Sequence, residues 1–101
     1  MTDVNAAQAA RMLVDRAQGV MDVALRRAAE VTGDGEAIDD HQVHGERIAY
    51  LATQVRAAAD LVAFVERVAG AGASDALHER MALAYAAEVT HALRSQVEAA
   101  W

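Results

Sequence analysis

The feature that most constrains this chain is an unbroken spacing of apolar residues between positions 48 and 69. They recur three and four residues apart, at Ile48, Leu51, Val55, Ala58, Val62, Val65 and Ala69. This spacing places them on one face of an α-helix, and its period is that of a heptad seam. A second apolar stripe lies beside the first, at Ala57, Leu61, Phe64 and Val68. We therefore expect this helix to have apolar neighbours on two sides and to be the central element of the fold.

Two other segments have the same helical spacing. In the first, the apolar positions are Leu13, Ala17, Val20, Ala24, Ala28 and Val31. In the last, they are Leu83, Ala86, Thr90, Leu93, Val97 and Trp101. The chain has no Pro, and its nine basic residues are all Arg, which favours helix throughout. The sequence therefore predicts an all-α fold, an antiparallel up-down bundle of three long helices at about 4–32, 39–69 and 75–100, in one domain spanning 1–101.

The acidic stretch GDGEAIDDHQ, residues 33–42, contains the signals that end the first helix and begin the second. Gly33 suits the left-handed position that follows a helix. Asp39 is a good N-cap, and Gln42 three residues later completes the pattern of a capping box. Ile38 and Val43 occupy the two positions of a hydrophobic staple, which fixes how the chain approaches the helix.

The second connector is also short. Gly70 and Gly72 are expected to end the second helix, and Ser74 or Asp75 is expected to cap the third. Because connectors of this length join neighbouring helices, the helices should run antiparallel in sequence order.

Charge and composition exclude several classes of protein. The net charge of −6 and the four aromatic residues argue against a nucleic-acid partner, whose binding relies on basic side chains and stacking. Cysteine is absent, so disulfides and thiolate metal sites are excluded. No uninterrupted apolar run reaches the roughly 18 residues of a membrane span, and no secretory signal begins the chain. We expect a cytoplasmic protein without a membrane partner.

A three-helix hairpin with a doubly apolar helix would leave apolar surface uncovered, and large uncovered patches are rare on monomers. The sequence therefore predicts a homo-oligomer, a dimer or a tetramer, which joins helix to helix. The residues expected to form the core and support the assembly are Ile48, Leu51, Val55, Val62, Val65, Leu93 and Val97.

In sequence, the three helices together resemble the C-terminal helical domain of the acyl-CoA dehydrogenase family. The segment DDHQVHGERIAYLATQVRAAADLVAFV (39–65) is similar to the family helix that begins with Phe-Gln and continues through a Leu-Ala-x-Met segment. AQGVMDVALRRAAE (17–30) is similar to the preceding family helix, and ERMALAYAAEVTHAL (79–93) to the following one, with Glu88 at the family's Glu. The resemblance implies a bundle that contributes to an FAD site and to a tetramer interface in an enzyme that oxidises acyl-CoA thioesters.

The family's functional residues do not carry over. In the first connector, Val31, Asp34 and Ala37 stand where the family has the Arg and Phe that hold FAD and a Pro. Acidic side chains beside a flavin pyrophosphate would repel it. Neither usual position of the catalytic Glu is matched, since one falls near Asn5 or Gln8 and the other lies beyond residue 101.

We therefore expect no catalytic, cofactor-binding or metal-binding residue in the chain acting alone, and a role in oligomerisation or partner binding. The alternative is a small subunit of a split acyl-CoA dehydrogenase, an oxidoreductase in which a larger chain supplies the catalytic base and the grip on FAD. A third possibility is a fragment with no function of its own.

One pair of histidines has a spacing that allows both to bind the same metal ion. His41 and His44 lie three residues apart at the start of the second helix, with Asp40 and Glu46 nearby. Imidazole and carboxylate suit first-row metals, but a further ligand would have to come from elsewhere in the fold. A solvated helix start is the interpretation we adopt. The acids of residues 33–42 also lack the spacing of a calcium-binding EF-hand loop.

Overall fold

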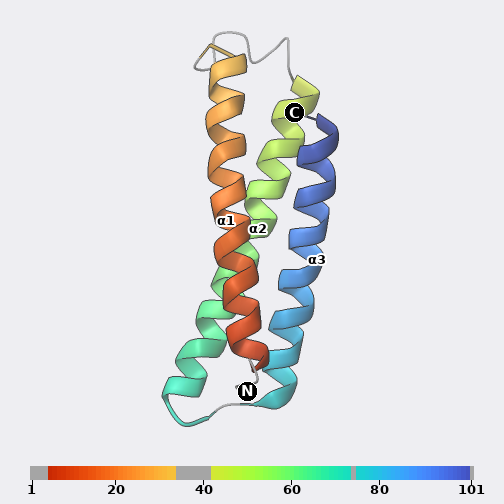
Figure 1. Ribbon diagram of the computed structural model, residues 1–101. Coiled ribbons are helices and arrows are strands. Elements are labelled where there is room, and N and C mark those ends of the chain that lie inside the picture. The colour runs from red at the N-terminus through yellow and green to blue at the C-terminus, as the bar shows by residue number, and fades with distance from the viewer. Residues whose placement is uncertain (1–4, 34–41, 74, 101) are drawn as a thin grey trace.

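The fold is a bundle of three long helices. The computed structural model describes residues 5–33, 42–73 and 75–100, with side chains described for 5–33, 45–73 and 75–96. Helix α1 spans Ala6–Val31, α2 spans Gln42–Gly70 and α3 spans Ala76–Ala100. Helix α2 runs antiparallel to α1 and α3, which are parallel to each other (Figure 1). The predicted all-α, up-down architecture is confirmed.

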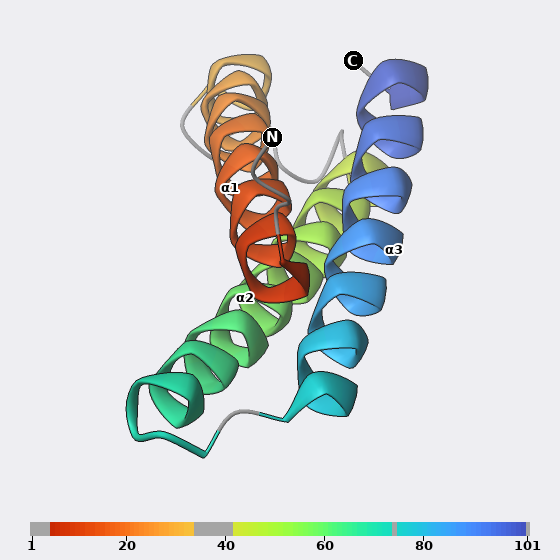
Figure 2. The same ribbon diagram turned by 60° about the horizontal axis from the view of Figure 1, so that its bottom comes forward.

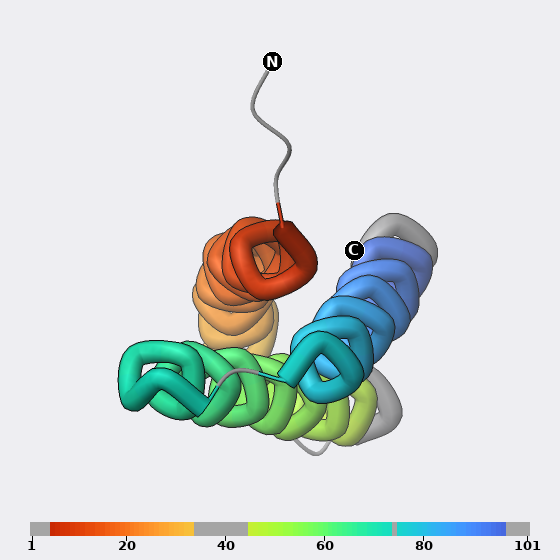
Figure 3. Tube along the Cα trace, turned by 90° about the horizontal axis from the view of Figure 1, so that it is seen from below, coloured from red at the N-terminus to blue at the C-terminus, as the bar shows by residue number. Residues whose placement is uncertain are grey.

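The arrangement of the helices differs from the expectation in one respect. Every helix contacts both others, and α1 packs against α3 at least as extensively as either packs against α2. Figure 2 shows α2 crossing behind the other two helices, and Figure 3 shows the three at the corners of a triangle. The prediction of a central α2 was wrong, because a triangle lets all three amphipathic helices share one core.

That core is a single apolar cluster drawn from all three helices. On α2 the predicted seam is buried except for Ala69, and Ala59 joins it. Its largest fully buried side chains are Val14, Val62 and Leu93, one from each helix. Of the other residues predicted for the core, Ile48, Leu51, Val55 and Val65 are buried, and the side chain of Val97 lies outside the description.

The buried stripes of α1 and α3 are displaced from the predicted ones. On α1 the buried residues are Ala10, Val14, Ala17, Met21 and Ala24, and on α3 they are Ala82, Ala86, Val89 and Leu93. Leu13 is only half-buried and Val20 is 42% exposed, although both belonged to the predicted stripe. Alanines allow the helix axes to approach closely, so the stripe richer in Ala faces the core and the larger residues lie at its margin.

Two helices begin with side-chain caps. The side chain of Asn5 accepts a 2.8 Å hydrogen bond from the Gln8 backbone N–H, and the Gln8 side chain accepts one of 3.2 Å from the Asn5 backbone. This capping box on α1 was not predicted. At α3, the Asp75 carboxylate accepts a 2.8 Å bond from the Leu77 N–H, so Asp75 is the cap that the sequence left open between two residues.

At the other end of α1, Gly33 has φ of 59°, the left-handed conformation predicted for it. The capping and staple residues predicted for α2 are not tested in the same way. Ile38 and Asp39 lie outside the described residues. Gln42 and Val43 lie in the first turn of α2, but their side chains are not described.

The packing predicts a contrast between two leucines of α3. Leu93→Ala should lower the free energy of unfolding by about 2–5 kcal/mol, because Leu93 is only 1% exposed and its truncation leaves a cavity. Leu77→Ala is the matched control, since Leu77 is 57% exposed and its truncation should cost less than about 1 kcal/mol. Urea denaturation followed by circular dichroism measures both, and equal losses would contradict the described core.

Candidate functional site

Metal-binding side chains do not gather into a cluster in the described part of the chain. Within residues 5–33, 42–73 and 75–100, no group of three or more His, Asp or Glu side chains could hold a metal ion. His41 lies outside those ranges and the side chain of His44 is not described. Glu46 and Glu88 are both exposed.

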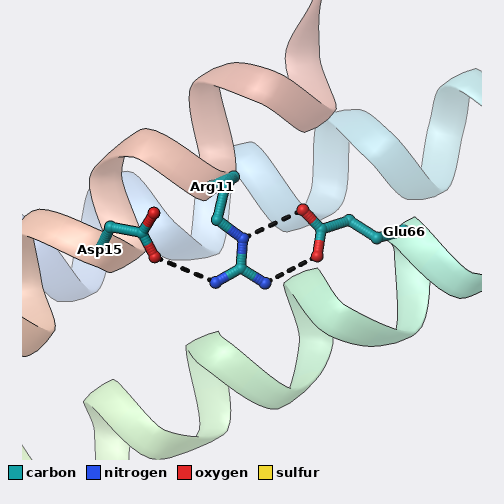
Figure 4. A network of polar contacts seen from close by, with 3 residues as sticks. All are labelled: Arg11, Asp15 and Glu66. Atoms are coloured by element: carbon teal, nitrogen blue, oxygen red, sulfur yellow. Dashed lines mark hydrogen bonds and ion pairs between the residues drawn. The ribbon is translucent and has the colours of Figure 1, made fainter.

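The most extensive polar network described joins α1 to α2 (Figure 4). The Arg11 guanidinium donates from Nε to Glu66 Oε2 at 3.0 Å and from Nη2 to Glu66 Oε1 at 2.7 Å. Its Nη1 donates to Asp15 Oδ1, one turn along α1, at 3.1 Å. Sequence reasoning missed this pair, because residues 55 positions apart meet only once the helices have packed.

The two hydrogen bonds between Arg11 and Glu66 shift the pKa of both residues. Hydrogen bonding to Arg11 lowers the pKa of Glu66 below its usual range, partly opposed by burial. Hydrogen bonds to Glu66 and then to Asp15 raise the pKa of Arg11, so it stays cationic. Both side chains are about a third or more exposed, so solvent screens the pair. We assign it a structural role, because a fork-to-carboxylate contact fixes the register of α1 on α2.

Several large apolar side chains lie on the outer surface of the bundle. The large side chains that are exposed are Met12, Val20, Val23, Leu25, Tyr50, Phe64, Leu77 and Met81. Tyr50 and Phe64 belong to the same stripe of α2, which also contains exposed Ala57 and half-buried Leu61 and Val68. We call Tyr50, Ala57, Leu61, Phe64 and Val68 the outer stripe.

The outer stripe is the second apolar stripe that the sequence shows on α2. The sequence predicted neighbours on both sides of this helix. In the structure the core seam is buried, and of the outer stripe only Leu61 is among the partly buried residues packed against the core. The largest side chains of the outer stripe therefore remain open to solvent, with Tyr50 65% and Phe64 47% exposed. This is the candidate functional site.

A groove between α2 and α3 opens beside Tyr50. Its volume is about 290 Å³, and it is lined by Arg47, Tyr50, Leu51, Gln54, Ala92 and Gln96. A larger groove of about 520 Å³ lies between α1 and α3, lined by Leu13, Arg16, Ala17, Val20, Thr90, Leu93 and Arg94. The groove between α2 and α3 is lined by polar side chains around the Tyr50 ring. The groove between α1 and α3 is lined mainly by apolar side chains, together with Arg16 and Arg94.

Charges of both signs flank the outer stripe on the side away from α3. In chain order they are Glu46, Arg56, Asp60 and Arg67. Arg56 and Asp60 lie one turn apart and form an ion pair of 3.3 Å. The Arg67 guanidinium lies 6.0 Å from the centre of the Phe64 ring, a distance at which a cation attracts the ring face. The flank therefore alternates in sign along the helix.

Helix α2 is also long and apolar enough to cross a membrane, judged by length and composition alone. The segment Gly45–Gly70 contains an 18-residue window of mean hydropathy 1.4. The core helix of a bundle meets the same criteria, and 39% of this window is buried inside the protein. Length and composition are therefore weak evidence for a membrane span, and in the structure α2 packs against both α1 and α3.

Comparison with known proteins gives no family for the chain. No protein-family model, curated protein or solved structure matches it. The resemblance to the acyl-CoA dehydrogenase C-terminal domain therefore remains a prediction from sequence pattern. The site has to be interpreted from its own chemistry.

The Arg11–Glu66 contact predicts a pH-dependent effect of Glu66→Gln. At pH 7 the variant should lose up to about 1 kcal/mol of unfolding free energy, the upper end for exposed ion pairs. Folding lowers the pKa of Glu66. The ion pair's contribution to the free energy of unfolding is therefore fully present above the unfolded pKa of about 4.5, and it is lost as the pH falls through the pKa of the folded state.

Urea denaturation of the wild type and Glu66→Gln between pH 7 and pH 2 measures this difference. Glu88→Gln is the control for the substitution itself, since Glu88 is an exposed glutamate of α3 and its replacement should cost less than about 0.5 kcal/mol at pH 7. A Glu66→Gln effect that stays constant down to pH 2 would contradict the proposed ion pair.

Proposed function

We propose that this chain is a non-catalytic helical assembly module that associates with copies of itself into a dimer or tetramer. The observation that supports the proposal is the outer stripe, where a regular set of apolar and aromatic side chains remains exposed on a packed bundle. Small domains bury only a modest fraction of their surface and are often completed by oligomerisation.

The size of the exposed apolar surface is in keeping with this role. Helix α3 begins across a short connector from the end of α2 (Figure 1), and its first turns contain the exposed residues Leu77 and Met81. Tyr50, Phe64, Leu77 and Met81 each expose about half or more of their surface, and exposed apolar patches of a few hundred Å² often have a function. A standard interface buries about 800 Å² per partner and is a little over half apolar.

We further propose that the bundle is shaped like the acyl-CoA dehydrogenase C-terminal domain, retains its assembly role and acts in the cytoplasm. The order of the three similar helices along the chain supports this proposal. Val31, where the related enzymes have an Arg that holds FAD, favours a non-catalytic role. Asp34 and Ala37, the other altered positions, lie outside the described residues.

The second candidate is a subunit of a split acyl-CoA dehydrogenase, and the groove between α1 and α3 favours it. Leu13, Val20 and Leu93 give this groove an apolar lining, while Arg16 and Arg94 give it positive charge in a chain of net charge −6. Such a groove suits an amphipathic acidic helix of a larger chain. In this candidate, the larger chain supplies the FAD site and the catalytic base.

The assembly proposal predicts the mass of the purified chain in solution. Light scattering coupled to size exclusion should give a multiple of 10.7 kDa, falling towards the monomer mass on dilution as an equilibrium between copies requires. A mass of one chain at every concentration would contradict the proposal.

The visible spectrum of the protein isolated with its native partners separates the two candidates. We expect a colourless homo-oligomer, because an assembly module needs no cofactor. A yellow complex whose flavin absorbance bleaches on addition of an acyl-CoA would instead support the split enzyme.

A further inference from the structure

The outer stripe has a symmetry that a second copy of the chain could match. Tyr50 and Phe64 each lie seven residues from Ala57, one on either side. Seven residues are close to two helical turns, so the three positions share one face of α2. If two α2 helices pack antiparallel about Ala57, Tyr50 of each copy meets Phe64 of the other.

Building on the proposed self-assembly, we propose that its basic unit is a dimer in which α2 pairs antiparallel with α2 of a second copy. The two-fold axis passes beside Ala57. Each Phe64 ring then enters the groove beside Tyr50 of the other copy.

The shape of the surface supports this pairing. Ala57 is exposed and small, so it allows the two helix axes to approach closely at the centre of the contact. A groove of about 290 Å³ opens beside Tyr50, the residue that the antiparallel register brings against Phe64 of the second copy. Gln54 and Ala92 form part of its lining. An aromatic pair in such a site gains about 0.5–1.5 kcal/mol beyond the burial of its area.

The charges of the flank are self-complementary in the same register. An antiparallel pair related by a two-fold axis brings the same flank of each helix together. In this register, the position opposite Arg67 of the second copy is one residue from Glu46. The position opposite Asp60 is two residues from Arg56, so in both pairs the long charged side chains can reach each other. Each of the four side chains then has a charge of opposite sign within reach, and symmetry repeats both pairs. Complementary charges of this kind select the register and orientation of a contact.

The exposed stripe of α1 lacks this property, which is why we choose α2. The antiparallel register that sets Val20 against Val23 of a second copy also sets Arg16 against Arg27. Like charges placed together disfavour a contact. The apolar residues on the outside of α1 therefore fit self-pairing less well than the outer stripe does.

Substitution of Phe64 tests whether the outer stripe of α2 forms the dimer contact. Phe64→Glu should raise the dimer dissociation constant by about tenfold or more, because it removes a central aromatic residue and places a charge in the contact. Phe64 is 47% exposed, so the variant should remain folded, as circular dichroism will show. Met12→Glu is the control, because Met12 is comparably exposed, at 49%, on the outside of α1. Its dissociation constant should stay within about twofold of wild type.

Cysteine cross-linking tests the register, and the absence of native cysteine makes single substitutions unambiguous. Ala57→Cys lies beside the axis and should cross-link to itself through a short bismaleimide. Tyr50→Cys and Phe64→Cys should each cross-link poorly alone and efficiently when the two variants are mixed. Met12→Cys should give no dimer band above background.

Charge exchange tests the orientation. Glu46→Arg and Arg67→Glu should each weaken the dimer about two- to fivefold, the scale of exposed ion pairs. Combining both changes in one chain should restore most of the affinity, because the pair is rebuilt with its signs exchanged.

The outcomes separate this inference from the proposal on which it rests. If the wild type is an oligomer and Phe64→Glu assembles like wild type, the antiparallel pairing is wrong and assembly uses another face. Strong self-cross-linking of Phe64→Cys without the mixed product would also overturn it, because it indicates a different register. If the wild type is a monomer at every concentration, the proposed function fails and this inference fails with it.

Discussion

The structure depends on the burial of one apolar core shared by three helices of similar length. Val14, Val62 and Leu93, one from each helix, are its largest fully buried side chains, and alanines make up much of the remainder. A core of small residues brings the helix axes close together and contributes modestly per residue, since hydrophobic stabilisation scales with the buried area. The capping box of α1 and the Arg11–Glu66 contact add local and interhelical constraints.

The same core leaves larger apolar side chains on the outside, and this connects packing with the proposed function. Leu13 and Val20 lie at the margin of the groove between α1 and α3 because the Ala-rich stripe of α1 faces inwards. On α2 the core seam packs against two neighbouring helices, while Tyr50 and Phe64 lie outside the core cluster and stay largely exposed. The stability of the single chain and its proposed assembly thus both depend on one distribution of residue sizes.

Sequence reasoning identified the three helices and the buried seam of α2, because each depends on periodicity and local signals. On α1 it placed Ala17 and Ala24 in the core correctly but also Leu13 and Val20, which lie at the margin. This helix has apolar residues over a broad arc, and only the neighbouring helices decide which of them are covered. The Arg11–Glu66 contact could not be predicted from the sequence, because no local pattern links residues so distant along the chain. The sequence also shows the stripe that contains Phe64, but it predicted that a neighbouring helix covers this stripe. In the structure Phe64 is exposed.

The central claim is that α2 pairs with α2 of a second copy, and nuclear Overhauser effects between differently labelled copies test it most directly. Within one chain Tyr50 and Phe64 lie about 21 Å apart along α2, at ~1.5 Å per residue, which is beyond the range of the effect. Phe64 is the only Phe in the chain, so its signals are unambiguous. The account predicts contacts between the Tyr50 and Phe64 rings that arise only between copies. An oligomer whose intermolecular contacts involve other faces and never this pair would contradict it.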